Sequence, residues 1–216
     1  MAETVAPEFA RFIEMERGAK RLPQAAARGK LAEGEVFPGV FISSARLTPL
    51  LRVAARQAAG FFRASTRTEV IWVEGDNELA VGFANVDVQA GDGTLRVTLP
   101  VRCDQIGKGT VSVLFAVGAP NAPAGLYAAT ASRPTGPDAV IAIWSEALVA
   151  FAWNCLLELV SGMAAAVGKD QRGNLLVPVE LSARKQGIEI VPMARFRFSG
   201  SSTLKSGTLK NTTVQS

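Results

Sequence analysis

Hydrophobic residues recur along the chain with two different periods, and the change between them predicts a mixed fold of helices and strands. In residues 7–17 and 49–63, apolar side chains stand three to four positions apart, which is the spacing of one face of an α-helix. Thr48 is the expected N-cap of the second helix, and Pro49 is suited to its first turn. These two segments predict a pair of helices before the central part of the chain.

Strict alternation of apolar and polar residues marks the β region. Between residues 94 and 103 every second side chain is apolar, which predicts an antiparallel strand with one buried face and one wet face. Gly91-Asp92-Gly93 before it predicts a hairpin turn, because Asp-Gly accepts positive φ. The same reasoning places strands at 68–74, 78–88, 94–103, 110–117, 175–182 and 187–198.

A long segment at 139–167 is apolar almost all the way round, which is typical of a helix buried in a core, in an assembly or in a membrane. Glu146 and Glu158 leave eleven uncharged residues between them, whereas a membrane span needs about 20. We therefore expect a central core helix and no membrane span. The expected fold class is α+β: an antiparallel sheet of about six strands packed on one long apolar helix.

Glycine and proline mark the irregular parts of the chain. Residues 18–46 read as an extended arm, and 118–137 as a long loop that is either functional or held by a partner. Residues 199–216 have the composition of a polar tail. The sequence thus divides into an N-terminal helix and arm, an α+β core domain and a C-terminal tail, at 1–46, 47–198 and 199–216.

The chain contains no histidine and only two cysteines, which narrows its chemistry. Nucleophilic systems that use a histidine base and zinc sites that need histidine are excluded. Cys103 and Cys155 lie in apolar patterns without CxxC spacing, so we expect buried free thiols in a reducing compartment. Neither a phosphate-binding loop nor a nucleophile elbow is present. We expect no catalytic, cofactor-binding or metal-binding residues.

Positive charge is concentrated near the N-terminus. Residues 1–66 hold ten Lys/Arg and six Asp/Glu. The net charge of this segment, +4, equals that of the whole chain. Arginine suits forked contacts with phosphate or acidic protein surfaces, although charge runs are most often solvated. The candidate partner-binding residues are the arginines of this region and the only tyrosine, in the long loop: Arg46, Arg52, Arg56, Arg63 and Tyr127.

Two carboxylates interrupt the long apolar helix. Glu146 and Glu158 are twelve residues apart, about 18 Å along a helix axis, so they cannot act as one acid–base pair. Each is expected to meet an arginine or to reach solvent, and the alternative is a catalytic acid in an apolar setting.

Three functions remain open on this evidence. The first is a non-enzymatic structural subunit of a large assembly, such as a virion or contractile-tail machine, which forms a homo-oligomer and contacts other subunits through arm, loop and tail. The second is a small-molecule-binding protein or histidine-free enzyme, with a pocket between sheet and helix that contains Glu146 or Glu158. The third is a nucleic-acid-binding module using the arginine helix. We expect a cytoplasmic or assembly-associated protein, because the first 30 residues show no secretory signal.

Overall fold

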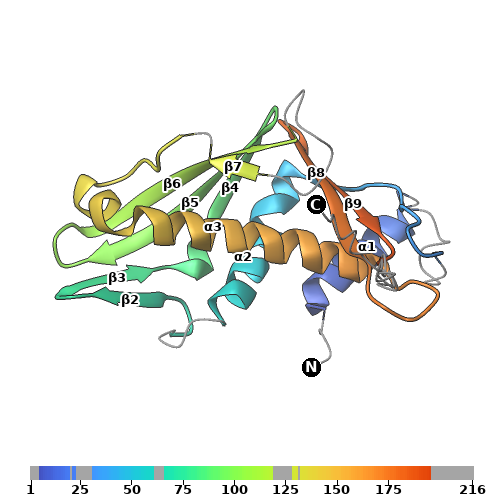
Figure 1. Cartoon of the computed structure of the whole chain (residues 1–216), viewed down its shortest axis with the longest axis horizontal. Helices are drawn as coiled ribbons and strands as arrows, with labels where there is room; N and C mark the ends of the chain where they lie inside the picture. Colours follow the sequence, from blue (N-terminus) through green and yellow to red (C-terminus); the bar gives the residue numbers. More distant parts are fainter. Residues whose placement is uncertain are drawn as a thin grey trace, which may run out of the picture.

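The fold is a mixed arrangement of helices and two antiparallel sheets, with one long helix that runs along both (Figure 1). The structure is a computed structural model, and it describes residues 5–19, 21–22, 31–60, 66–118, 128–130 and 132–195. The expected fold class is confirmed. The strands, however, divide between two sheets, whereas the alternating pattern of the sequence predicted a single one.

The larger sheet has six strands in the order β2-β3-β5-β6-β7, with β4 pairing beside β3 on the same edge of β5. In β5, Leu95, Val97 and Leu99 are fully buried while Arg96 and Arg102 are exposed, so the predicted wet face is confirmed. The strands are β2 (Val70–Glu74), β3 (Asn77–Val81), β4 (Asp87–Gly91), β5 (Thr94–Cys103), β6 (Gly107–Val117) and β7 (Ala128–Thr130).

The smaller sheet has three strands in the order β1-β9-β8, namely β1 (Val40–Ser43), β8 (Val177–Arg184) and β9 (Gly187–Met193). Strand β1 lies in the segment that was expected to be an irregular arm, and that prediction is wrong for residues 40–46, which form β1 and the start of α2. Phe37 donates its backbone N–H to Pro192, and Ala194 donates to Glu35. This part of the arm is therefore held along β9 of its own chain.

Helix α3 (Asp138–Val167) runs along the long axis of the molecule and contacts both sheets, as Figure 1 shows. Its first half packs on the larger sheet, where Trp144 lies 6.2 Å from Trp72 of β2 between ring centroids. Its second half packs against α1 (Pro7–Gly18) and the smaller sheet. The guanidinium of Arg17 donates to the carbonyl of Val167, which satisfies one unpaired acceptor at the end of α3.

By length and composition alone, α3 could cross a membrane, and it is the one described helix of which this is true. In the structure, 44% of its most apolar 18-residue window is buried. A central helix of a packed core meets the same criteria. The absence of a membrane span therefore stays a prediction.

Helix α2 (Ser44–Ala59) begins five residues earlier than the sequence indicated, so the predicted N-cap is wrong. The hydroxyl of Thr48 instead donates to the carboxylate of Asp87 at 2.6 Å, and Pro49 lies inside the helix. Pro49 is only the sixth helical residue, so its missing N–H removes a single bond close to the helix start. The side chain of Thr48, which the local pattern assigned to helix capping, thus forms a tertiary hydrogen bond with β4 instead.

The predicted single strand at 78–88 is also wrong, because a short 3-10 helix at Phe83–Asn85 divides it into β3 and β4. Both halves pair with β5, at different places along it. The break falls opposite Pro100, whose carbonyl accepts a hydrogen bond from Gly82. Pro100 has no N–H to offer a neighbouring strand, so the ladder beside it cannot be continuous.

One hydrophobic cluster includes residues from both sides of position 46, with Phe9 and Ile13 of α1 packed together with the core of the sheets and α3. The boundaries at 46 and 198 stay predictions about the sequence. The predicted tail at 199–216 lies outside the described residues.

Candidate functional site

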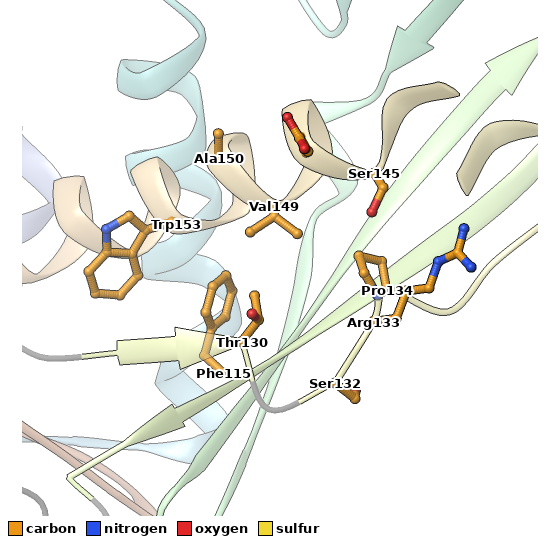
Figure 2. A pocket seen from close by; sticks show the side chains of 10 residues that line it. Phe115, Thr130, Ser132, Arg133, Pro134, Ser145, Val149, Ala150 and Trp153 are labelled. Carbon is orange, nitrogen blue, oxygen red and sulfur yellow. The ribbon is translucent and has the colours of Figure 1, made fainter. Parts of the chain in front are cut away.

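A groove with a cavity volume of about 680 Å³ lies between α3 and the edge of the larger sheet formed by β6 and β7 (Figure 2). It is larger than three other grooves of the described residues, which have volumes of about 70, 270 and 250 Å³. Its size falls within the range of small-molecule sites in proteins, about 300–1,000 Å³. We therefore take it as the candidate functional site.

One face of α3 forms the first wall. Ser145, Glu146, Val149, Ala150 and Trp153 line the groove, and their spacing of three to four residues places them along one side of the helix. The wall is polar at its first turn and apolar over the next two turns. A helix that is apolar almost all round thus presents a carboxylate and a hydroxyl at one end of this groove.

The floor is aromatic. Trp153 is half-buried, and its ring lies 5.7 Å from that of Phe115 in β6, at an interplanar angle of 41°. Figure 2 shows these two rings together at one end of the groove, with Val149 beside them and Ser145 and Arg133 toward the other end. An apolar molecule on this floor would be shielded from water on one side and could contact both rings.

A bulge in the edge strand forms the second wall. Thr130 pairs with Phe115, and Thr135 forms a bridge with Ser112, which leaves two more residues on the outer strand than an unbroken ladder would hold. Bulges redirect side chains at sheet edges. Here Arg133 is exposed in the extra segment and lines the groove, while Pro134 is buried.

The groove carries two opposite charges that are not used elsewhere in the described part of the chain. Glu146 and Arg133 are both exposed, and neither has a hydrogen bond or an ion pair with any described residue, including each other. They come from opposite walls. Charged groups lining an apolar groove without a protein partner are available to a ligand that carries the complementary charge.

Of the arginines predicted to bind a partner, Arg46, Arg52 and Arg56 lie exposed on α2, and none of them lines this groove. The Nε of Arg52 donates to the carbonyl of Val86 at 3.0 Å, so part of this side chain serves to attach α2 to the larger sheet. Arg46 approaches the sulfur of Met15 at 3.8 Å. The other two candidates, Arg63 and Tyr127, lie outside the described residues.

Glu146 is the one residue of the groove that the sequence indicated as a candidate for chemistry. It reaches solvent, as expected, whereas Glu158 is half-buried and does not line the groove. Neither Arg133 nor Trp153 was indicated as a site residue by the sequence. The pairing of Thr130 with Phe115 and of Thr135 with Ser112 holds the segment that contains Arg133 beside the sheet, and such long-range pairing is not visible in a local pattern.

A second, smaller groove of about 270 Å³ lies between α1 and β1. Its rim includes Met15, which is 42% exposed, Phe41, which is 47% exposed, and Arg46. Both apolar side chains stand beside the outer edge of β1, and β9 is the one partner of β1 among the described strands. This edge is a second candidate surface, here for contact with a protein.

The comparisons with known proteins do not identify this chain. No family model, no curated protein and no solved structure matches it. Among the described residues, no group of three or more Cys, Asp or Glu side chains is placed to hold a metal ion. A functional conclusion therefore depends on the geometry and chemistry of the grooves themselves.

Proposed function

We propose that this protein binds a small amphipathic molecule in the groove between α3 and β6–β7. The observation that carries the proposal is an aromatic floor that continues, inside one cavity of about 680 Å³, into charged groups that pair with no described residue. Ligand sites commonly combine an apolar lining with a few polar groups that fix orientation. The proposal is one of binding, and it includes no reaction.

Each part of the groove has a role in this function. Trp153 and Phe115 would contact the apolar body of the ligand, and contact with one such ring contributes about 1–2 kcal/mol, or roughly 5- to 30-fold in affinity. Ser145, Glu146 and Arg133 would orient its polar end. This function is the one in which Glu146, an exposed carboxylate in a largely apolar helix, has a direct use.

The test is to fill the groove with a side chain. Ala150 is exposed and lines the groove, so Ala150→Phe would occupy it without disturbing the core. Ala142, two turns earlier on α3, is also exposed but does not line the groove, and Ala142→Phe is the matched control. Binding of anilinonaphthalene sulfonate would be followed by its fluorescence, and native mass spectrometry of the purified protein would detect a co-purified ligand.

We expect the wild-type chain and Ala142→Phe to bind the dye with the same affinity. The affinity of Ala150→Phe for the dye should be at least tenfold lower. Equal binding by all three proteins would refute the groove as the site. Circular dichroism of the variants would confirm that each has kept its fold.

A second candidate function, that of a subunit in an assembly, is favoured by the surface around β1. Phe41 and Met15 are exposed beside a strand edge, and exposed apolar groups next to an unpaired edge are typical of protein contacts. We expect an oligomer in analytical ultracentrifugation that dissociates with Phe41→Ser. Val73→Ser on β2, where Val73 is 68% exposed, is the control. A monomer at all concentrations would count against homo-oligomer formation through this surface.

The nucleic-acid hypothesis has less support. Arg52 already contacts Val86. Arg46 lines the groove between α1 and β1 together with the exposed ring of Phe41, whereas Arg52 and Arg56 do not line it. The hypothesis stays a prediction, tested by whether binding to DNA weakens with salt and with Arg56→Ala.

A further inference from the structure

The two ends of the α3 groove differ in chemistry, and the difference constrains the ligand. Trp153 follows Glu146 by seven residues, which places them about 10 Å apart along the helix axis. Ser145 and Arg133 lie together at the polar end, and Trp153 and Phe115 at the apolar end, as Figure 2 shows. A ligand that fills the groove thus has a polar head and an apolar body of about this length.

The polar end holds a carboxylate and a guanidinium at once. Glu146 projects from α3 and Arg133 from the bulge opposite, and the two do not form an ion pair with each other. A head with a single charge would be attracted by one of these groups and repelled by the other. A head with both charges can place its cation at Glu146 and its anion at Arg133.

We propose that the groove selects amphiphiles with a zwitterionic head, in which a cationic and an anionic group are carried by one apolar body. This inference rests on the proposed function, because it names the class of ligand for the same groove. The shared chemistry can come from two sources, an amino acid with an apolar side chain or a phosphocholine lipid head.

The test compares probes that share an octyl chain and differ in the head. The zwitterions are octylphosphocholine and an amino acid with an octyl side chain. The singly charged and neutral probes are octyl sulfate, octyltrimethylammonium and octyl glucoside. Each would be titrated, below the concentration at which it forms micelles, into the full chain, with affinity measured by calorimetry and by tryptophan fluorescence.

We expect at least one zwitterion to bind about two- to fivefold more tightly than any of the other three probes. The factor is modest because both side chains are exposed, and exposed ion pairs are screened by water and salt. The advantage should shrink as salt is raised. Which of the two zwitterions binds more tightly distinguishes the amino-acid source from the lipid source.

Two variants assign the charges. Glu146→Gln should weaken the binding of octyltrimethylammonium and of the zwitterions. The binding of octyl sulfate should stay unchanged or become tighter. Arg133→Gln should weaken the binding of octyl sulfate and leave the binding of octyltrimethylammonium unchanged or tighter. The controls are Glu74→Gln on β2 and Arg184→Gln on β8, which change the same charges at exposed positions outside the groove and should alter no affinity.

The outcomes separate this inference from the proposed function. If all five octyl probes bind equally and Ala150→Phe abolishes binding, the groove is a ligand site without head-group selection, and the zwitterion proposal is overturned. If no probe binds, or if binding survives Ala150→Phe, both proposals fail. Selection that persists in Glu146→Gln and Arg133→Gln would likewise overturn the assignment of the two charges.

Discussion

Gly162 lies where α3 passes over α1, and a side chain there has no room. A Cβ at this position would overlap the ring of Phe9, which is fully buried. Glycine in a helix interior is less favourable than alanine by about 1 kcal/mol. At this position helix propensity therefore favours alanine, whereas the close packing of the two helices favours glycine. The larger of these two effects decides whether a substitution of Gly162 stabilises or destabilises the protein.

We predict that Gly162→Ala destabilises the protein by up to about 2 kcal/mol, because overpacking costs about 1–3 kcal/mol and the gain in helix propensity offsets about 1. The free energy of unfolding in urea measures this. In the background Phe9→Leu, where the ring is absent, the same substitution should be neutral or stabilising. A loss of equal size in both backgrounds would contradict the packing explanation.

The two thiols differ in environment. Burial raises the pKa of the Cys155 thiol to about 12, since it is fully buried in α3. Cys103 is half-buried at the end of β5, so the expectation of two buried thiols is confirmed for Cys155 only, while both are free. Because thiols react as thiolates, only one of them should be reactive in the folded protein.

We predict that iodoacetamide at neutral pH modifies Cys103 in the native protein and Cys155 only after unfolding. Peptide mass spectrometry measures the modification at each site. Because the pKa is raised in the folded state, the protonated thiol of Cys155 contributes to the free energy of unfolding. This contribution is fully present below the ordinary thiol pKa of about 8.5 and declines as the pH rises above it. Rapid modification of Cys155 in the native state would contradict its burial.

At the scale of elements, the loop between α3 and β8 fastens the N-terminal segment to the rest of the molecule. Asp170 accepts hydrogen bonds from the side chain and backbone of Asn174 and from the backbone N–H of Arg172. Gln171 in turn donates to the carbonyl of Leu31, and Arg172 pairs with Glu33 at 3.1 Å. One carboxylate thus shapes the loop that contacts residues 31–33.

The hydrogen bond from the Asn174 side chain, together with the backbone donors, holds the pKa of the Asp170 carboxyl below its ordinary value. We predict that stability from this group is present above about pH 4 and is lost as the pH falls through the lowered pKa. Asp170→Asn should reduce stability at neutral pH and flatten its decline in acid. Urea unfolding across pH 2 to 7 measures both, and an unchanged acid profile would count against the role of Asp170.

The edge strand β7 shows how an element too short to predict can position a site. It has three residues, and it lies in a segment that reads as a loop because of its proline and glycine content. Pairing with β6 fixes Thr130 beside the groove, and the bulge after it turns Arg133 toward α3. The site thus depends on a pairing between residues that the sequence does not mark as strand.

At the scale of the whole molecule, α1 and the sheets share a single core, although the sequence suggested a division at residue 46. All three tryptophans lie after that position. If the core unfolds as one unit, a substitution in α1 should shift the transition that these tryptophans report.

We predict that Ile13→Ala, at a fully buried position, lowers the free energy of unfolding reported by tryptophan fluorescence by about 2–5 kcal/mol. The control is Met15→Ala on the same helix, at a side chain 42% exposed, which should change it by about 0.5 kcal/mol or less. Fluorescence and circular dichroism should give the same midpoint. An unchanged tryptophan transition in Ile13→Ala would show that residues 1–46 form a separate unit.

The sequence by itself determined the fold class, the long core helix, the hairpin at Asp92-Gly93 and the buried face of β5. These features depend on local periodicity and turn chemistry, which neighbouring residues set on their own. Gly93 has a φ of 68°, as its hairpin required. The carboxylate at Glu146 was also evident, because a charge in an apolar helix is conspicuous in any fold.

Only the tertiary structure decided how the strands divide between two sheets, where β1 and β7 pair, and which residues face one another across the α3 groove. Pairing between distant strands depends on register and on the cost of bringing the chain together, neither of which is recorded in a local pattern. Arg133 and Trp153 are 20 residues apart in the sequence, on different elements. They share a groove because a bulge in one strand and the face of one helix meet in space.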